Sequence, residues 1–201
     1  YRDYLRNECQ DKNPSADYIL MCLVDFSDDG LLVLPTHRQV RCTIKTSELL
    51  KRLHKYFDVM PDTRAGLFAF TGEIDAAQVS VGLYTKDEKR AYRLILKDGS
   101  GYEKLMPAQA SRLWKRLNVS VLSYCVFKDI LGLSDAEFQE VVTYTHSTTA
   151  AFAAVDDNTV DFSFFLQGID KFKIKDISEQ GELMPQKSTY FYPKLFTSFV
   201  M

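Results

Sequence analysis

The sequence predicts an α+β domain built on a mainly antiparallel sheet that is packed with helices. Residues 79–85 and 90–97 alternate apolar and polar side chains around the charged turn at 86–89, which is the pattern of a β-hairpin. Residues 48–57 and 119–131 instead carry apolar side chains at the three- and four-residue spacing of amphipathic helices. Antiparallel strands and helices that cover each other's apolar faces place the chain in the α+β class.

The beginning of the chain predicts a helix, a hairpin and a loop. Residues 1–10 are good helix formers, and the apolar run 17–25 is typical of a buried strand. A turn separates this run from residues 31–34, so the two segments are expected to pair as an antiparallel hairpin. Pro35 ends the second strand, which leaves Thr36-His37-Arg38 in a loop at the strand end.

The rest of the chain predicts further helices and strands in irregular order. Ser47 is expected to cap the helix 48–57, Pro107 suits a first helical position, and Gly132 should end the helix 119–131. The other expected elements are a loop at 58–64, a strand at 66–70, a helix from the capping box at 134–137 to 142, a strand at 142–145, a helix at 148–155, a strand at 159–166, a helix at 170–180 and a strand at 196–201.

Composition limits the classes of function. The chain has 201 residues, 46% hydrophobic and 26% charged, which suits one globular domain over residues 1–201. The net charge of −2 gives no support to nucleic-acid binding. The four cysteines are too scattered for a zinc or redox motif, and neither a metal site nor a cofactor is indicated. No membrane span or signal peptide is visible, so we expect a cytoplasmic protein.

The segment Met-Pro-Gln-Lys-Ser-Thr-Tyr-Phe-Tyr-Pro-Lys-Leu at 184–195 is the most unusual part of the sequence. It combines two prolines with two lysines, and no acidic residue occurs from 183 to 201. If Ser188 and Thr189 converge with Lys187 or Lys194, they form a cradle for phosphate or carboxylate. The alternative is a rigid surface turn with solvated lysines.

A second cationic segment lies at Thr36-His37-Arg38. Residues 30–47 contain no acid, so Thr36 and Arg38 are candidates for anion binding. The charge of Arg38 favours the neutral form of His37, which makes His37 the candidate for orienting or transferring a proton. The alternative is a structural histidine beside an arginine paired with an acid. Residues 105–128 are also acid-free, and there a basic helix face is the simpler interpretation.

Both cationic segments resemble motifs of the bacterial and archaeal family called domain of unknown function 1015. The resemblance rests on 184–195 and on Gly-Leu-Leu-Val-Leu-Pro-Thr-His-Arg at 30–38. Fuller members of that family carry, upstream of this region, a Gly-His-His-Arg-Tyr motif similar to phosphate-handling ParB and sulfiredoxin-like domains, which this chain lacks. We therefore expect this chain, which begins at Tyr1, to be the C-terminal portion of such a protein.

Two functions follow from these observations. The first is a site for a small anionic metabolite or nucleotide, formed where the two cationic segments meet, with kinase-like phosphate transfer as its most specific form. The second is a non-catalytic module for dimerisation, for example as a homodimer, or for ligand sensing. Lys187 and Arg38 separated by more than about 15 Å would favour the second, because one small anion needs contacts near 3 Å from both.

Overall fold

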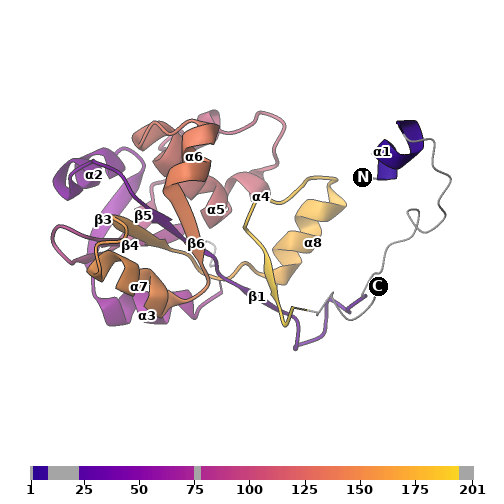
Figure 1. Cartoon of the computed structure of the whole chain (residues 1–201), viewed down its shortest axis with the longest axis horizontal. Coiled ribbons are helices and arrows are strands. Elements are labelled where there is room, and N and C mark those ends of the chain that lie inside the picture. Colours follow the sequence, from indigo (N-terminus) through magenta and orange to yellow (C-terminus); the bar gives the residue numbers. More distant parts are fainter. Residues whose placement is uncertain (1, 9–22, 75–77, 195–201) are drawn as a thin grey trace. The chain divides into compact units, whose positions relative to one another are not determined.

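The computed structural model describes residues 2–8, 23–74 and 78–194 (Figure 1). The chain divides into two compact units, residues 1–30 and residues 31–201. In the first unit the described residues form helix α1 (Arg2–Asn7), as predicted, and an irregular segment at 23–30. The second unit contains all the strands described below. That residues 1–201 form a single domain remains a prediction.

The second unit is organised around a six-stranded sheet with the order β3-β5-β4-β7-β2-β6, in which every neighbouring pair is antiparallel. The strands of this sheet are β2 (His37–Val40), β3 (Phe57–Asp62), β4 (Ser80–Thr85), β5 (Ala91–Leu96), β6 (Val142–Thr145) and β7 (Phe162–Phe165). The helices are α2 (Thr46–Leu53), α3 (Arg64–Thr71), η2 (Tyr102–Leu105), α4 (Arg112–Lys115), α5 (Asn118–Val121), η3 (Leu122–Ile130), α6 (Asp135–Val141), α7 (Thr148–Asp156) and α8 (Lys171–Glu179).

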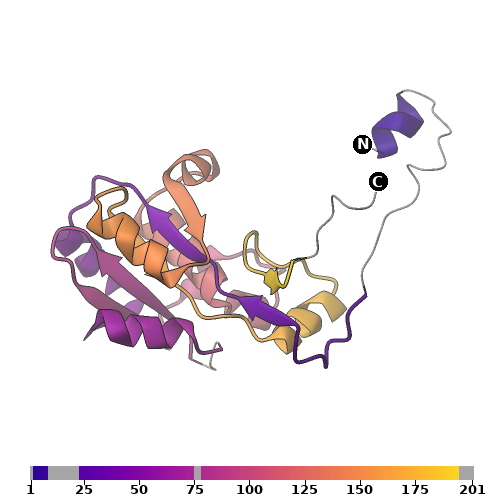
Figure 2. The same ribbon diagram turned by 60° about the horizontal axis from the view of Figure 1, so that its bottom comes forward.

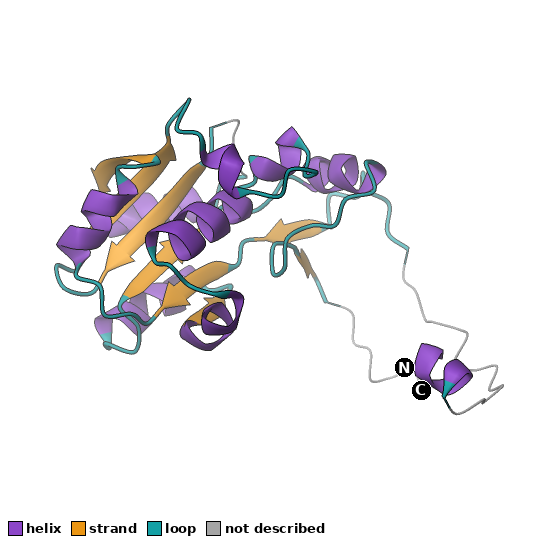
Figure 3. Ribbon diagram, turned by 90° about the horizontal axis from the view of Figure 1, so that it is seen from above, coloured by secondary structure: helices purple, strands orange, loops and turns teal. Residues whose placement is uncertain are grey.

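Helices cover both faces of the large sheet (Figure 3). On one face, buried side chains of α2, α5 and η3 form the larger core with the strands. On the other face, α3 and α7 form a smaller core around Phe152. Strand β7 serves both, because Phe164 faces the larger core and Phe165 the smaller one, as the two-residue period of a strand requires.

A second, two-stranded sheet joins β1 (Leu32–Leu34) to β8 (Tyr190–Tyr192). The two strands lie side by side (Figure 2). They are antiparallel, and Val33 lies opposite Phe191. Only two residues separate β1 from β2, so the pairing of β1 with β8 fixes residues 190–192 of the 184–195 segment next to the start of β2. Gly168 approaches this pair closely, since a Cβ atom there would lie 2.6 Å from the carbonyl oxygen of Val33.

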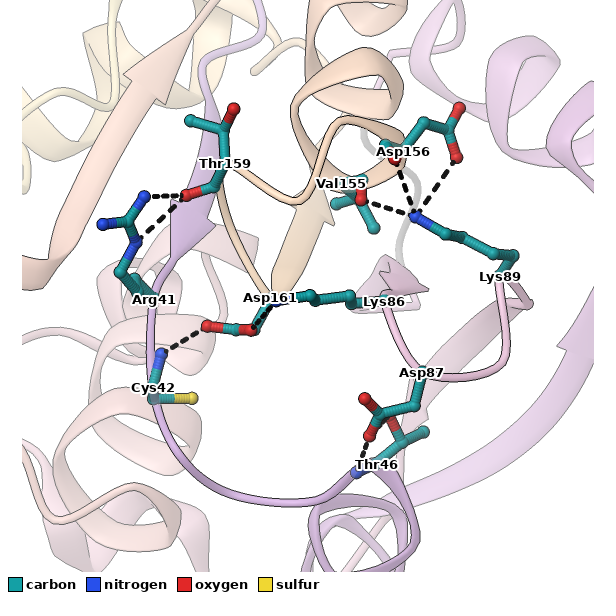
Figure 4. A network of polar contacts seen from close by, with 10 residues as sticks. All are labelled: Arg41, Cys42, Thr46, Lys86, Asp87, Lys89, Val155, Asp156, Thr159 and Asp161. Carbon is teal, nitrogen blue, oxygen red and sulfur yellow. Dashed lines mark hydrogen bonds and ion pairs between the residues drawn. The ribbon is translucent and has the colours of Figure 1, made fainter.

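The opposite end of β2 is held by a network of polar contacts (Figure 4). Asp161 accepts a hydrogen bond from the main-chain N–H of Cys42 and lies 3.1 Å from the ammonium of Lys86. Arg41 donates to the carbonyl of Thr159, and Lys89 donates to the carbonyls of Val155 and Asp156. These contacts bind the end of β2 to the β4–β5 turn and to the α7–β7 turn, which makes β2 a rigid support.

The predicted α+β class with its antiparallel sheet is confirmed. The predicted hairpin is formed by β4 and β5, and the capping box at Ser134 and Glu137 opens α6. The predicted helix at 119–131 corresponds to α5 and η3, with Gly132 in the left-handed region at φ 69° just after them. The predicted strands at 142–145 and 159–166 and the predicted helices at 148–155 and 170–180 also occur, as β6, β7, α7 and α8.

Two predictions between residues 57 and 71 are wrong. The expected strand at 66–70 is helix α3, because the Thr63 side chain accepts a hydrogen bond from the N–H of Gly66 and thereby caps a helix. The expected loop at 58–64 contains β3. Pro61 is tolerated in that strand because β3 lies at the edge of the sheet, where one side of the backbone needs no partner.

Helix starts were also misplaced. Helix α2 begins at Thr46 after Lys45, so Ser47 lies inside the helix rather than at its cap. Pro107 follows η2 and starts no helix; Ser111 caps α4 instead, by accepting a hydrogen bond from the N–H of Trp114.

The predictions around β1 need correction as well. His37 and Arg38 do not lie in a loop, because they form the start of β2 between β6 and β7. Residues 23–25 are not part of a strand, and β1 pairs with β8. The remaining part of the expected strand at 17–25 and the expected strand at 196–201 lie outside the described residues. Among the described helices, none is long and apolar enough to cross a membrane.

Candidate functional site

The two cationic segments of the sequence meet in the fold. Pairing of β1 with β8 aligns residues 32–34 with residues 190–192. Beyond that pair, the Nη2 group of Arg38 donates a hydrogen bond of 2.9 Å to the main-chain carbonyl of Lys187. The two segments are therefore in direct contact. The distance is far shorter than the separation of about 15 Å that would have favoured the non-catalytic module.

Arg38 occupies an unusual position for a charged side chain. It lies on β2 between Tyr144 of β6 and Phe164 of β7, on the face of the larger core, and is 2% exposed. Its Nη1 group donates to the carbonyl of Thr36 and its Nη2 group to that of Lys187. No carboxylate pairs with Arg38 in the part of the chain that the structure describes.

The charge of Arg38 survives its burial. Burial lowers the pKa of Arg38 from 12.5 to about 10, so the guanidinium is still protonated at neutral pH. Its two hydrogen bonds to carbonyl oxygens leave further N–H donors of the guanidinium for other acceptors. A buried cation that is satisfied only by carbonyl dipoles is costly, and a bound anion would offset that cost.

The turn at 185–188 is shaped to present its backbone to Arg38. Lys187 has φ 55°, in the left-handed region, and its side chain is exposed. Ser188 is buried and its hydroxyl donates to the carbonyl of Pro185 over 2.5 Å. Lys187 thus contributes its carbonyl oxygen, and Ser188 stabilises the turn.

A cavity of about 410 Å³ opens beside Arg38. Besides Arg38 and Tyr144, its walls come from α4, from η3, from α6 and from the 184–195 segment. These contribute Trp114, Ser123, Tyr124, Lys128, Asp135, Phe138, Gln139, Pro185 and Gln186. We call this cavity the Arg38 pocket. Pro185 and Gln186 make the 184–195 segment one of its walls, as the sequence suggested.

The helical wall of the Arg38 pocket has a second cation. Helix η3 is a π-helix of nine residues, a rare form that often marks functional positions. Lys128 of η3 lies 2.7 Å from Asp135 and 5.0 Å from the centre of the Tyr124 ring. The Lys128 and Asp135 side chains are 42% and 83% exposed, so this ion pair lies at the open side of the pocket.

His37 is engaged on both of its ring nitrogens. The N–H of Leu166 donates to Nδ1 over 3.3 Å, so the ring proton is on Nε2, which donates to Thr148 Oγ1 over 3.1 Å. Thr148 Oγ1 lies 3.0 Å from Thr71 Oγ1, which donates to the carbonyl of Phe68. Burial first, and the charges of Arg38 and His146 second, lower the pKa of His37 from 6.5 to about 4. His37 is therefore a neutral, enclosed side chain that ties β2 to α7 and α3.

Thr36 is also engaged within the protein. Its hydroxyl lies 3.2 Å from Nδ1 of His146, and the same nitrogen lies 3.1 Å from the carbonyl oxygen of Pro35. A carbonyl only accepts, so Nδ1 of His146 carries the proton. The His146 ring stacks on Tyr190 with ring centres 3.7 Å apart. This cluster fixes the β1–β2 junction against β8.

The sequence-predicted site residues are thus only partly brought together. Arg38 lines the pocket, while Thr36, Lys187 and Ser188 support the surrounding backbone. Thr189 and Lys194 do not line the pocket, and the Lys194 ammonium lies 4.7 Å from the centre of the Tyr190 ring. No cluster of three potential metal ligands occurs among the described residues.

Sequence reasoning missed most of the pocket wall. Trp114, Tyr124 and Lys128 lie within the acid-free segment 105–128, which was interpreted as a basic helix face. This segment lacks acidic residues just as the two cationic segments do, so the same signal could have identified it as part of an anion site.

Comparison with solved structures identifies similar folds. A conserved hypothetical protein from Pyrococcus furiosus aligns with a TM-score of 0.50 and 16% identity over 85% of this chain and 60% of that protein. A free serine kinase in complex with AMP aligns with a TM-score of 0.48 and 17% identity over 85% of this chain and 57% of the kinase. At these identities the likeness concerns the fold alone. This chain spans about three fifths of the length of these structures.

The family comparison corrects one expectation and confirms another. No curated protein matches the sequence. The profile of the family described as protein of unknown function DUF1015 matches residues 1–120, so the expectation that this chain is the C-terminal portion of such a protein is not borne out. Because this match covers more than half of the 201 residues, the chain belongs to the DUF1015 family.

Proposed function

We propose that this protein binds a small anionic molecule in the Arg38 pocket, through a phosphate or carboxylate group of that molecule. The observation that carries the proposal is the buried Arg38 guanidinium, which opens onto a cavity and has no acidic partner among the described residues. A planar guanidinium matches the oxygen spacing of phosphate and carboxylate, and charged hydrogen bonds are strong in a partly buried site.

Lys128 is the second contact in this proposal. Its ammonium lies 2.7 Å from Asp135 at the open side of the pocket, so an anion that reaches it competes with Asp135. Thr36, Lys187 and Ser188 serve by holding Arg38 and the 185–188 turn in place. Lys194 and the side chain of Lys187 add positive charge outside the pocket.

The arrangement supports binding more than kinase-like transfer. A transfer reaction needs a group that accepts a proton, and the nitrogens of His37 are both used inside the protein. The only carboxylate that lines the described pocket is Asp135, which is paired with Lys128. Ligand sensing is therefore the preferred form of the proposal. Kinase-like transfer, a homodimer and a cytoplasmic location remain predictions.

Thermal unfolding in the presence of orthophosphate, citrate, phosphorylated sugars and nucleotides tests the proposal. A ligand that binds only the folded state raises the melting temperature progressively with its concentration. Arg38→Met should abolish the shift; because it leaves the carbonyls of Thr36 and Lys187 without their donor and so lowers stability, circular dichroism verifies that the variant is folded. Lys128→Met should reduce the shift.

Arg41→Met is the matched control, since the Arg41 side chain is exposed and, among the described residues, hydrogen-bonds to the carbonyl of Thr159 alone. It should leave the shift unchanged. A wild-type protein whose melting temperature responds to no anion in this panel would overturn the proposal.

A further inference from the structure

We infer that the ligand of the Arg38 pocket combines an anionic group with a planar aromatic ring in one small molecule. This inference rests on the proposed function and names the class of ligand. Aryl phosphates, aromatic carboxylates and nucleoside monophosphates share this chemistry. Simple sugar phosphates and aliphatic carboxylates do not.

The first observation is that aromatic rings from separate elements line one cavity. Trp114 comes from α4, Tyr124 from η3, Phe138 from α6 and Tyr144 from β6. Each of these elements directs one ring at the same space. A site for a bare phosphate needs polar donors and has no use for rings, whereas aromatic walls favour a flat apolar body.

The second observation is that the rings are held in fixed positions. The indole N–H of Trp114 donates to the carbonyl of Leu183 over 2.9 Å, and its ring meets Tyr124 edge-on with centres 6.0 Å apart. Phe138 meets Phe127 of the core in the same way at 5.2 Å. Walls that are already ordered lose little conformational freedom when a ring binds against them, which favours affinity.

The third observation is that each cation of the pocket lies beside one of its rings. The Arg38 guanidinium lies 5.8 Å from the centre of the Tyr144 ring, and the Lys128 ammonium lies 5.0 Å from the centre of the Tyr124 ring. Positive charge and aromatic surface are thus neighbours on both sides of the cavity. A ligand that carries both a negative group and an aromatic ring satisfies both at once.

Size and polarity agree with such a ligand. The volume of about 410 Å³ falls within the range of about 300–1,000 Å³ that is typical of small-molecule sites. Gln139 and Gln186 also line the pocket, and a carboxamide side chain offers both a donor and an acceptor to substituents on a ring.

The experiment compares pairs of anions that differ by a ring. The pairs are phenyl phosphate with glycerol phosphate, benzoate with acetate, and AMP with ribose 5-phosphate. Trp114 is the only tryptophan of the chain, so quenching of its fluorescence reports binding at the pocket itself. We expect the ring-bearing member to bind about 10-fold or more tightly, because stacking on an aromatic side chain contributes that much.

Substitution of Tyr124 separates ring contact from general affinity. Tyr124→Leu removes one of the four rings, with its contacts to Trp114 and Lys128, but leaves the Arg38 guanidinium, so the ratio of affinities within a pair should fall while binding of glycerol phosphate persists. Tyr124→Phe keeps the ring and should keep the ratio. Both changes are at a half-buried position, and circular dichroism verifies the fold.

The outcomes distinguish the inference from the proposed function. Equal affinity within all three pairs overturns the inference while the anion site stands. Failure of every anion to bind overturns both. A preference within the AMP pair alone supports the inference and identifies nucleotides as the source of the ring. A preference within the phenyl phosphate or benzoate pair supports it and identifies simple aryl anions.

Discussion

Arg38 and Lys187, 149 residues apart in the sequence, are joined by a hydrogen bond of 2.9 Å from the Arg38 guanidinium to the Lys187 carbonyl. This contact, with the β1–β8 pairing beside it, closes the 184–195 segment over the start of β2. It also aligns the guanidinium, because a second carbonyl, that of Thr36, accepts from the other terminal nitrogen.

The first prediction concerns this double contact. Arg38→Lys keeps the charge but replaces a planar fork by one ammonium, which cannot reproduce both hydrogen bonds. We expect the free energy of unfolding to fall by about 1–3 kcal/mol, the cost of leaving a buried carbonyl unsatisfied. Urea unfolding measures this. Arg41→Lys, at an exposed arginine that contacts one carbonyl, should change stability by less than about 0.5 kcal/mol. If both variants lose the same stability, the two hydrogen bonds of the Arg38 guanidinium do not contribute to the free energy of unfolding.

The chemistry of this region was predictable from sequence, but its geometry was not. Runs without acids identified Arg38 and the 184–195 segment as cationic. The sequence could not reveal that Lys187 would offer its carbonyl, because that depends on its left-handed backbone. Nor could it reveal the ring of Tyr144 beside Arg38, since the two meet only through pairing of β2 with β6.

The fold was predicted best where local signals were strong. The β4–β5 hairpin has a charged turn between alternating strands, and α6 has a capping box. Prediction failed at β3, where Pro61 looked like a loop signal, because edge position is a property of the whole sheet. The strand at 31–34 was predicted correctly as β1, but its partner was not, because β8 lies far along the chain.

The second prediction concerns pH. The pKa of His37 is about 4 in the folded protein and 6.5 when exposed, so its contribution to stability is present above pH 6.5 and is lost as the pH falls toward 4. This loss amounts to roughly 3 kcal/mol by pH 4. Urea unfolding of the wild type and of His37→Gln across this range should show a smaller pH dependence in the variant.

A direct measurement supports that comparison. The chain has three histidines, and NMR titration can follow each ring separately. His37 should stay neutral, with its proton on Nε2, until the pH approaches 4. A midpoint near 6.5 for His37 would contradict the enclosed position described for it.

The third prediction concerns the hydroxyl of Thr148, which accepts the hydrogen bond from Nε2 of His37. Thr148→Val keeps the shape of the side chain but removes the acceptor for Nε2 and the contact with Thr71. Stability should fall by about 1–3 kcal/mol, because a buried donor loses its partner. Thermal or urea unfolding checks this. Thr149→Val is the control, because Thr149 is exposed one position further along the same helix. An equal loss of stability in both variants would show that the His37–Thr148 hydrogen bond does not stabilise the fold.

The fourth prediction concerns the close approach of Gly168 to β1. The Cβ of Gly168→Ala would lie 2.6 Å from the main-chain oxygen of Val33, so the backbone of β1 must move. We expect a loss of about 1–3 kcal/mol, as for other overpacked sites. Displacement of β1 should also weaken its pairing with β8 and loosen the 185–188 turn that supports Arg38.

Hydrogen exchange localises the effect of Gly168→Ala. Amides of residues 32–34 and 190–192 should exchange faster in the variant, whereas amides of β4 and β5 should not. Gly72→Ala is the matched control, because its Cβ would lie 3.4 Å from the carbonyl of Ala69, an ordinary contact. Since only the Gly168 change disturbs the support of Arg38, it alone should also weaken the binding of anions. Unchanged exchange in β1 and β8 would mean that the junction absorbs the added methyl group elsewhere, and that the β1–β8 pair does not hold Arg38 in position.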